Sequence, residues 1–298
     1  NYYVDFANKK LGGAYKTDGF VQEEIMFIEF PEMYQIATEL ETKKKNQTRQ
    51  LENTDNNNGA EEVGKGIPTP IIIKNVIRSS IIAKNVAIPA IPPIPPNPPL
   101  YEPFYGNQYN TDYIINFPHN NPQNQILYLQ QFIHSSHTVN TAINAQGPPP
   151  NPQRVVPNPQ VNILAIAAPH VNNNVEPLSK TTIEDFLYSL YNAFYMVNKN
   201  NDKINAKPTV TIHTGKLGSG VFNNDPILSG VIQIIVAKQF GFDIILYDYT
   251  DVEGKIIFYI TELILSKVKT DTKEYFYDIV DLVFNEFNNN PGIVKRQI

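Results

Sequence analysis

The second half of the chain alternates two kinds of apolar pattern, and this alternation constrains the fold more than any other feature. Residues 161–168 form a short, almost entirely apolar run, which is typical of a central strand covered on both faces. Helix-type and strand-type runs then alternate at 181–194, 208–213, 226–240, 242–247 and 276–287. Strands and helices that alternate with short links predict an α/β fold with a largely parallel sheet and helices on both faces.

Three helix starts can be predicted from residue types. Thr181 and Glu184 form a capping box, in which the threonine hydroxyl accepts a hydrogen bond from an N–H of the first turn. Asp271 and Glu274 resemble a second capping box before the final helix. Pro226 suits a first turn, because the N–H groups there have no partner within the helix. We therefore expect helices to begin near these three positions.

The first half of the chain is less regular. Residues 2–7, 71–77 and 81–88 predict strands, and residues 31–40 carry apolar side chains at helical spacing. Three low-complexity stretches, one polar and rich in asparagine and two dense in proline, lie at 43–66, 89–103 and 146–160. We expect residues 1–298 to form one domain, with these stretches as loop insertions.

Composition excludes several classes of function. The formal net charge is −5, which argues against a broad nucleic-acid-binding surface, although backbone N–H groups can still hold a small anion. The chain has no cysteine and no run of about twenty apolar residues, so we expect no disulfide and no membrane-spanning helix. His134 and His137 lie three residues apart without a third ligand at matching spacing, and we expect no metal and no cofactor. Because the chain begins at Asn1 instead of Met, we expect a fragment or a processed product.

The first thirty residues carry a pattern that points to a polar ligand. A strand-like run ends at Asn8, and Gly12 and Gly13 then let the backbone approach a ligand, because no Cβ intrudes. Glu23 and Glu24 stand side by side at the start of the next apolar run. Adjacent side chains diverge by about 100° on a helix and about 180° on a strand, so one carboxylate can face a ligand while the other is held elsewhere. The alternative is a solvated acidic first turn of a helix.

A second glycine loop lies between a predicted strand and a predicted helix. Residues 214–225 read Thr-Gly-Lys-Leu-Gly-Ser-Gly-Val-Phe-Asn-Asn-Asp and precede Pro226. Ligands of open α/β sheets bind beyond the carboxyl ends of the strands, where Gly218 and Gly220 permit close backbone approach. The N–H groups at the start of the following helix can hold phosphate. The alternative is that this segment is only a turn.

The first pattern resembles the catalytic signature of the poly(ADP-ribose) glycohydrolases. That signature reads roughly D-F-A-N, G-G-G and G-x-V-Q-E-E-I-R-F. The corresponding segments here are Asp5-Phe-Ala-Asn8, Gly12-Gly13 and Gly19-Phe-Val-Gln-Glu-Glu24-Ile-Met-Phe27. Two positions depart, because Ala14 replaces the third glycine and Met26 replaces a basic residue.

The second loop resembles the phosphate-binding loop of the same family, G-N-W-G-C-G-A-F-G-G-D. The matching residues are Gly215, Gly218, Gly220, Phe222 and Asp225, and the departures are Lys216, Leu217, Ser219, Val221, Asn223 and Asn224. The resemblance covers the first thirty residues and roughly residues 161–287. The middle third of the chain does not take part in it.

The resemblance implies a macrodomain-like three-layer α/β/α sandwich with a mixed, largely parallel sheet and long low-complexity loop insertions. It also implies a glycosidase that hydrolyses ribose–ribose bonds in poly(ADP-ribose), releases ADP-ribose and so reverses ADP-ribosylation. Such reactions pass through an oxocarbenium-like state, in which a carboxyl group protonates the leaving oxygen and then activates water. By position, Glu24 matches the general acid/base, and Glu23 matches its ribose-positioning neighbour.

The same matches imply which residues bind the substrate. Asn8 and Gln22 correspond to residues that orient the ribose and the glutamate pair, and Gly12 and Gly13 line the first loop. The residues implied to hold the diphosphate are Gly218, Ser219, Gly220, Val221 and Phe222. Of these, Phe222 would also lie against the distal ribose.

Three alternatives to polymer hydrolysis stay open. A mono-ADP-ribosyl-protein hydrolase would cleave ADP-ribose from protein, and a non-catalytic reader would bind ADP-ribose without cleaving it. A structural or interaction protein built on the proline-rich stretches would bind no ADP-ribose. The partners that we expect are ADP-ribose or poly(ADP-ribose) and ADP-ribosylated proteins, without direct nucleic-acid binding and without a membrane. We expect a monomer located in the cytoplasm or the nucleus.

Overall fold

A computed structural model describes nine stretches of the chain. They are residues 1–13, 22–30, 32–50, 67–77, 160–171, 178–201, 209–220, 222–268 and 275–289. The strand expected at 81–88, the insertion at 89–103, residues 146–159, His134, His137 and the box at 271–274 lie outside them. By internal contacts the chain divides into two compact units. This division does not test whether residues 1–298 form one domain, so the single domain stays a prediction. The first unit is Asn1–Leu11, Gln47–Ile73 and Ile163–Ile298, and the second is Gly12–Asn46 and Lys74–Asn162.

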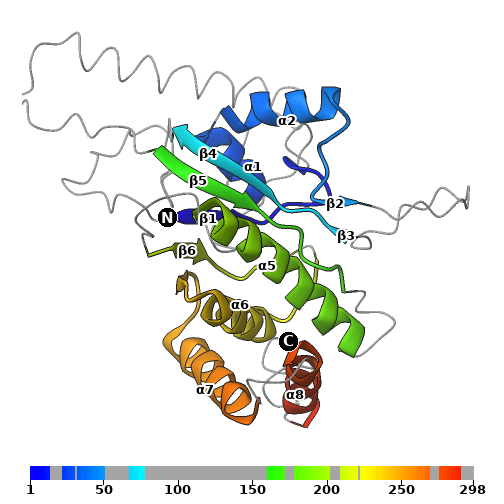
Figure 1. The fold of residues 1–298 in the computed structure, drawn as a ribbon, viewed down its shortest axis with the longest axis vertical. Coiled ribbons are helices and arrows are strands. Elements are labelled where there is room, and N and C mark those ends of the chain that lie inside the picture. Colours follow the sequence, from blue (N-terminus) through cyan, green and yellow to red (C-terminus); the bar gives the residue numbers. More distant parts are fainter. Residues whose placement is uncertain are drawn as a thin grey trace, which may run out of the picture. The chain divides into compact units, whose positions relative to one another are not determined.

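A five-stranded sheet forms the centre of the first unit, and each strand has at least part of its length there (Figure 1). The strand order is β4-β5-β1-β6-β7, with bounds Ile71–Ile77, Gln160–Ala165, Tyr2–Asp5, Thr211–Thr214 and Asp243–Leu246. β1 and β7 both pair with β6 in parallel, with Tyr2 opposite Ile212 and Thr214 opposite Leu246. The α/β class and a sheet with parallel pairing, both expected from the sequence, are confirmed.

Four helices complete the first unit. They are α5 (Lys180–Asn201), α6 (Pro226–Phe240), α7 (Asp251–Lys267) and α8 (Tyr275–Asn289). α6 packs against α5 and α7, and α8 packs against the same two helices. Alternate residues of β1 and β6, including Val4 and Ile212, point into the core that the helices form with Phe186, Leu190 and Val231. Burial of one such side chain stabilises the fold by about 1.5–3 kcal/mol.

The start of α5 differs from the prediction. The helix begins at Lys180, and the hydroxyl of Ser179 accepts a hydrogen bond from the Thr182 N–H at 3.1 Å. The cap is therefore Ser179 and not Thr181, which already lies inside the helix. The segment offers three neighbouring hydroxyl groups, and only the backbone geometry decides which of them reaches an N–H three residues further on.

The start of α6 was predicted from the sequence, whereas that of α7 was not. α6 begins at Pro226 as predicted, and the Asp225 carboxylate accepts from the Leu228 N–H at 2.9 Å. α7 was not predicted, although it begins with a capping box in which Thr250 and Glu253 bond each other's backbone. The sequence signal for this helix was therefore present in Thr250-Asp-Val-Glu253.

A buried arginine lies in the stretch that was expected to be a polar surface insertion from residue 43 onward. β2 (Arg49–Gln50) pairs antiparallel with β3 (Ile67–Pro68), and the side chain of Arg49 is 1% exposed. Arg49 donates to both carboxylate oxygens of Asp185, to the Ser189 hydroxyl and to the Ala167 carbonyl. These partners lie more than a hundred residues away in the sequence, so no local sequence pattern predicts the contacts.

The second unit contains two short helices, α1 (Gln22–Glu29) and α2 (Glu32–Thr42). Phe30 joins them, because its N–H donates to the Met26 carbonyl at 2.8 Å and its carbonyl accepts from the Met33 N–H at 2.9 Å. α2 ends where the Lys45 N–H returns to the Leu40 carbonyl. The helix expected at 31–40 is thus present, and the glutamate pair lies on a helix.

Three rings stack on the face of the first unit's sheet opposite Ile212. Tyr3 stacks on His213 with a 4.3 Å centroid distance, and His213 Nδ1 lies 3.0 Å from the Tyr247 hydroxyl. Burial lowers the pKa of His213 from 6.5 to about 4, because the charged imidazolium is disfavoured away from water. His213 therefore stays neutral in the folded chain at neutral and mildly acidic pH.

We expect the free energy of unfolding to fall as the pH is lowered from about 6.5 to 4. Between these values the unfolded chain protonates His213 and the folded chain does not, so the unfolded state is favoured by up to about 3 kcal/mol. Urea unfolding at pH 7, 5.5 and 4 measures the slope. His213→Phe keeps a ring in the stack but cannot titrate, and it should remove this part of the slope. An unchanged slope in His213→Phe would show that other groups cause it.

Candidate functional site

The predicted glutamate pair is buried in the first turn of α1. Glu23 is 2% exposed and Glu24 is 5% exposed, so they are not a solvated acidic turn. Glu23 Oε1 accepts a hydrogen bond from the Gly12 N–H at 2.5 Å. A Cβ added to Gly13 would collide with Glu23 Oε2 and would lie 3.1 Å from Glu24 Oε1. Both carboxylates therefore converge on the glycine pair, and Gly13 also has a positive φ of 43° that favours glycine.

Gln22 occupies the position before this pair and is also buried. Its Nε2 contacts Met26 Sδ one turn along α1. Met26 is the residue that stands where the resemblance leads one to expect a basic side chain, so this departure changes what lies beside Gln22. The structure thus brings Gly12, Gly13, Glu23 and Glu24 together, with Gln22 on the same helix turn.

Asn8 belongs to the first unit, in the turn after β1. Its side-chain oxygen accepts from the Lys9 N–H at 2.7 Å, and its carbonyl accepts from the Thr48 hydroxyl. The Thr48 N–H donates to the Lys9 carbonyl at 2.8 Å. Thr48 therefore holds the turn that carries Asn8. This role was not predicted, since Thr48 lies in the stretch expected to be an insertion.

The second glycine loop, residues 214–225, connects β6 to α6 as predicted. Gly218 has a φ of 75° and Asn223 a φ of 56°, so both adopt the left-handed backbone conformation. The N–H groups of Leu217, Ser219, Asn223 and Asn224 donate to carbonyls inside the loop. Within the described part of the loop, no hydrogen bond is made by the N–H groups of Gly218, Gly220 and Phe222. Backbone N–H groups without a protein partner in such a turn can hold an anion. Val221 lies outside the described residues.

The side-chain amide of Asn224 holds this loop together. Asn224 is 3% exposed, and its Nδ2 donates to the carbonyls of Pro169 at 2.6 Å, Gly218 at 3.1 Å and Phe222 at 3.4 Å. A Cβ on Gly218 would lie 2.6 Å from the Ala168 methyl and 2.7 Å from Asn224 Nδ2. Only glycine fits at position 218, because the conformation and the space both require it.

Two polar residues of α6 form hydrogen bonds with the loop. Gln233 Nε2 donates to the Gly215 carbonyl at 3.0 Å, and Gln233 Oε1 accepts from the Thr214 hydroxyl at 2.6 Å. The Ser229 hydroxyl donates to the Leu217 carbonyl at 2.9 Å. Ser229 and Gln233 are completely buried, and they lie one turn apart in the first twelve residues of α6, 226–237, which are otherwise apolar. That isolated polar pair was a sequence signal for loop support that our sequence analysis did not use.

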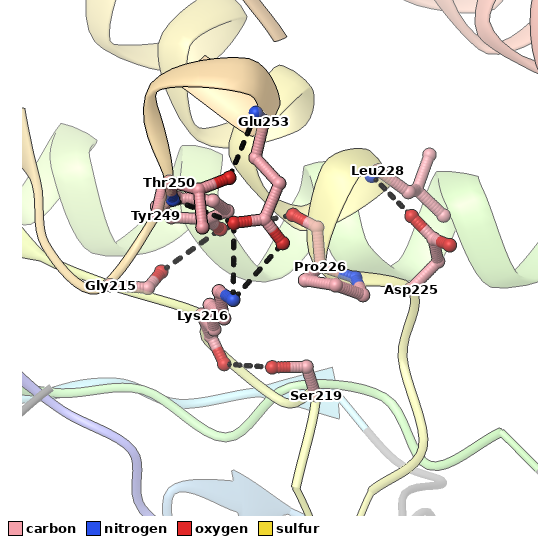
Figure 2. A network of polar contacts seen from close by, with 9 residues as sticks. All are labelled: Gly215, Lys216, Ser219, Asp225, Pro226, Leu228, Tyr249, Thr250 and Glu253. Carbon is pink, nitrogen blue, oxygen red and sulfur yellow. Dashed lines mark hydrogen bonds and ion pairs between the residues drawn. The ribbon is translucent and has the colours of Figure 1, made fainter. Parts of the chain in front are cut away.

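Lys216 in the loop is engaged by the start of α7 (Figure 2). Figure 2 shows its Nζ directed to Glu253, at 3.1 Å, and the ammonium also lies 5.3 Å from the Tyr249 ring centroid. Burial alone would raise the pKa of Glu253, but hydrogen bonds from Thr250 and Lys216 lower it below its ordinary value. The Lys216 charge is therefore neutralised at the start of α7.

Two residues of the same network, Tyr249 and Asp225, have raised pKa values. Burial raises the pKa of Tyr249 far above its usual range, and its hydroxyl donates to the Pro226 carbonyl at 2.9 Å. Burial also raises the pKa of Asp225, although the Leu228 N–H favours its charged form. The Ser219 hydroxyl donates to the Lys216 carbonyl at 2.6 Å, so Ser219 closes its own turn. These contacts make the loop a rigid part of the α6–α7 region.

The described stretches contain no cluster of three or more histidine, aspartate or glutamate side chains arranged to hold a metal ion. None of the described helices is both long enough and apolar enough to cross a membrane.

We expect Lys216→Met and Glu253→Gln each to destabilise the fold by about 1 kcal/mol, with strongly non-additive effects, because each removes the same partly buried ion pair. Urea unfolding of both single variants and of the double variant measures the coupling. The exposed pair of Lys238 and Glu262, whose side chains are 46% and 48% exposed, is the matched control. That pair should show a coupling of at most about 0.5 kcal/mol. Equal coupling in the two cycles would contradict a structural role for Lys216.

Comparison with known proteins gives a family for the first part of the chain. Residues 1–62 match the family model described as poly(ADP-ribose) glycohydrolase, macro domain fold. No match to a curated protein was found. The matched stretch contains Asn8, the glycine pair and both glutamates, and its macro domain fold agrees with the five-stranded α/β sheet. Over these 62 of its 298 residues, the chain is similar to the poly(ADP-ribose) glycohydrolases, as its sequence motifs indicated.

Proposed function

We propose that the chain hydrolyses the ribose–ribose glycosidic bonds of poly(ADP-ribose) and releases ADP-ribose. The observation that carries this proposal is the convergence of two buried carboxylates, Glu23 and Glu24, on the Gly12–Gly13 turn. The pair lies inside the stretch that matches the glycohydrolase family. Burial of two adjacent carboxylates costs free energy of folding, and a catalytic use would account for that cost.

In this proposal the two glutamates have different tasks. Glu23 is already fixed by the Gly12 N–H, so it positions the ribose and the glycine turn. Glu24 acts as general acid and gives its proton to the leaving ribose oxygen while the anomeric carbon–oxygen bond breaks. The resulting carboxylate then takes a proton from the water that attacks the anomeric carbon. Asn8 and Gln22 orient the ribose.

The second glycine loop is proposed to bind the diphosphate of ADP-ribose. The N–H groups of Gly218, Gly220 and Phe222 supply donors without a net charge, since Lys216 is engaged by Glu253. Polar contacts from Asn224 and Gln233 hold the loop in place before any ligand arrives. A loop that is already ordered loses little entropy on binding, which favours affinity. The proposed partners are ADP-ribosylated proteins, and a monomeric state and a cytoplasmic or nuclear location remain predictions.

We expect Glu24→Gln to reduce the release of ADP-ribose from poly(ADP-ribosyl)ated protein by about 10²–10⁴-fold, because glutamine keeps the shape but cannot transfer the proton. Release of free ADP-ribose from a purified ADP-ribosylated protein is the measurement. Glu39→Gln is the matched control, since Glu39 lies on exposed helix surface in α2. It should leave the rate unchanged.

Other outcomes of the same assay would assign the chain differently. Release from mono-ADP-ribosylated protein alone would make it a mono-ADP-ribosyl-protein hydrolase. Binding of ADP-ribose without any release would make it a reader. If the chain neither released nor bound ADP-ribose, that result would contradict the proposed site.

A further inference from the structure

Residues 167–171, the β5 tail, follow β5 and contact the second glycine loop. Asn224 Nδ2 donates to the Pro169 carbonyl at 2.6 Å, and the Val171 N–H donates to the Phe222 carbonyl at 2.9 Å. The Ala168 methyl fills the space at Gly218 where a Cβ would be. The tail and the loop are therefore tied together at three points within the first unit.

Arg49 anchors the other end of the β5 tail. Its Nε and one terminal nitrogen donate to the Ala167 carbonyl at 3.2 and 3.0 Å. The remaining donors bind Asp185 and Ser189 on α5. Because this guanidinium is almost fully buried, its release would leave several polar groups without partners. The β5 tail is thus held by α5 on one side and by the glycine loop on the other.

His170 is the one residue of the β5 tail with a polar side chain. Residues 167–169 are buried, whereas His170 is half-buried. Its ring meets the Phe222 ring edge-on, with centroids 6.0 Å apart and planes at 72°. Among the described residues, no side chain or backbone group forms a hydrogen bond with the His170 ring nitrogens. The fixed tail therefore holds an imidazole with unused hydrogen-bonding nitrogens next to Phe222.

We propose that His170 contacts the substrate and forms a hydrogen bond with a hydroxyl of the ribose that lies against Phe222. This inference rests on the proposed function and on the position of the distal ribose against Phe222, which the resemblance to the glycohydrolases implies. The apolar face of a phenyl ring can pack against a sugar but cannot fix its hydroxyl groups. A neighbouring imidazole supplies both a donor and an acceptor in its neutral form. His170 would thereby distinguish ligands that carry the distal ribose from those that lack it.

A purely structural role for His170 makes a different prediction, and the choice of variant separates the two. His170→Phe keeps a ring that packs on Phe222 but has no hydrogen-bonding nitrogen. His170→Gln loses the ring but keeps a donor and an acceptor. A thermal melt of each variant confirms that the fold is intact, and half-exposed substitutions of this kind have small effects on stability.

The test is calorimetric titration of wild type, His170→Phe and His170→Gln with two ligands, ADP-ribose and ADP. ADP has the same diphosphate but lacks the distal ribose. We expect His170→Phe to bind ADP-ribose about five- to tenfold more weakly than wild type and to bind ADP as wild type does, which corresponds to one lost hydrogen bond. His170→Gln should recover part of the ADP-ribose affinity.

Other results would overturn the proposal in distinguishable ways. Equal affinity of wild type and His170→Phe for ADP-ribose would remove His170 from the substrate contacts and leave the proposed function standing. Equal weakening of both ligands would show that the ring only supports the loop. Failure of wild type to bind ADP-ribose would overturn the proposed function together with this inference.

Discussion

The side-chain amide of Asn224 determines how the second glycine loop and the β5 tail lie against each other. Its two N–H groups are directed at carbonyls from two chain segments that are far apart in sequence, namely the β5 tail and the glycine loop. Each hydrogen bond contributes about 1 kcal/mol in net terms, but a buried carbonyl left without a partner would cost about 1–3 kcal/mol. The arrangement therefore depends on Asn224 more strongly than the mean strength of its bonds suggests. The same arrangement also requires glycine at position 218, because the missing Cβ leaves room for Ala168 and Asn224.

Among the described residues, the basic side chains of Lys216 in the loop and of Arg49 at the β5 tail are both engaged within the protein. Lys216 is paired with Glu253, and Arg49 is paired with Asp185. The first pair links the loop to α7 and the second links β2 to α5, so both charges hold segments of the fold in place. In the proposed diphosphate site, the donors within the described part of the loop are neutral backbone N–H groups. This explains how a chain with a net charge of −5 can offer an anion site without a basic surface.

Most of the regular elements could be predicted from the sequence, because their signals are local. The apolar run at 161–168 gave β5, and Pro226 gave the start of α6. The start of α5 was misplaced, because Ser179 and Thr181 are equally good caps and only the backbone chooses between them. α7 was missed even though Thr250 and Glu253 form a capping box.

The candidate site was only partly predictable, for a different physical reason. The glycines and glutamates could be recognised from motifs, and the structure brings Gly12, Gly13, Glu23 and Glu24 together, while their roles stay predictions. Arg49 and Thr48 could not be recognised, because their partners are distant in sequence and their polarity alone predicts exposure, whereas Gln233 gave a local signal that was missed. His170 was likewise missed, since nothing in the sequence places it beside Phe222. Positions that support a site need the fold before their role can be seen.

The binding of an anion by neutral backbone groups can be observed directly. In a sample labelled with ¹⁵N-glycine, the 15 glycine amide signals are few enough to assign individually. Titration with ADP-ribose should shift the signals of Gly218 and Gly220, whereas those of Gly241 and Gly254, at the end of α6 and within α7, should stay in place. If ADP-ribose binds while the Gly218 and Gly220 signals remain unmoved, the second glycine loop does not hold the diphosphate.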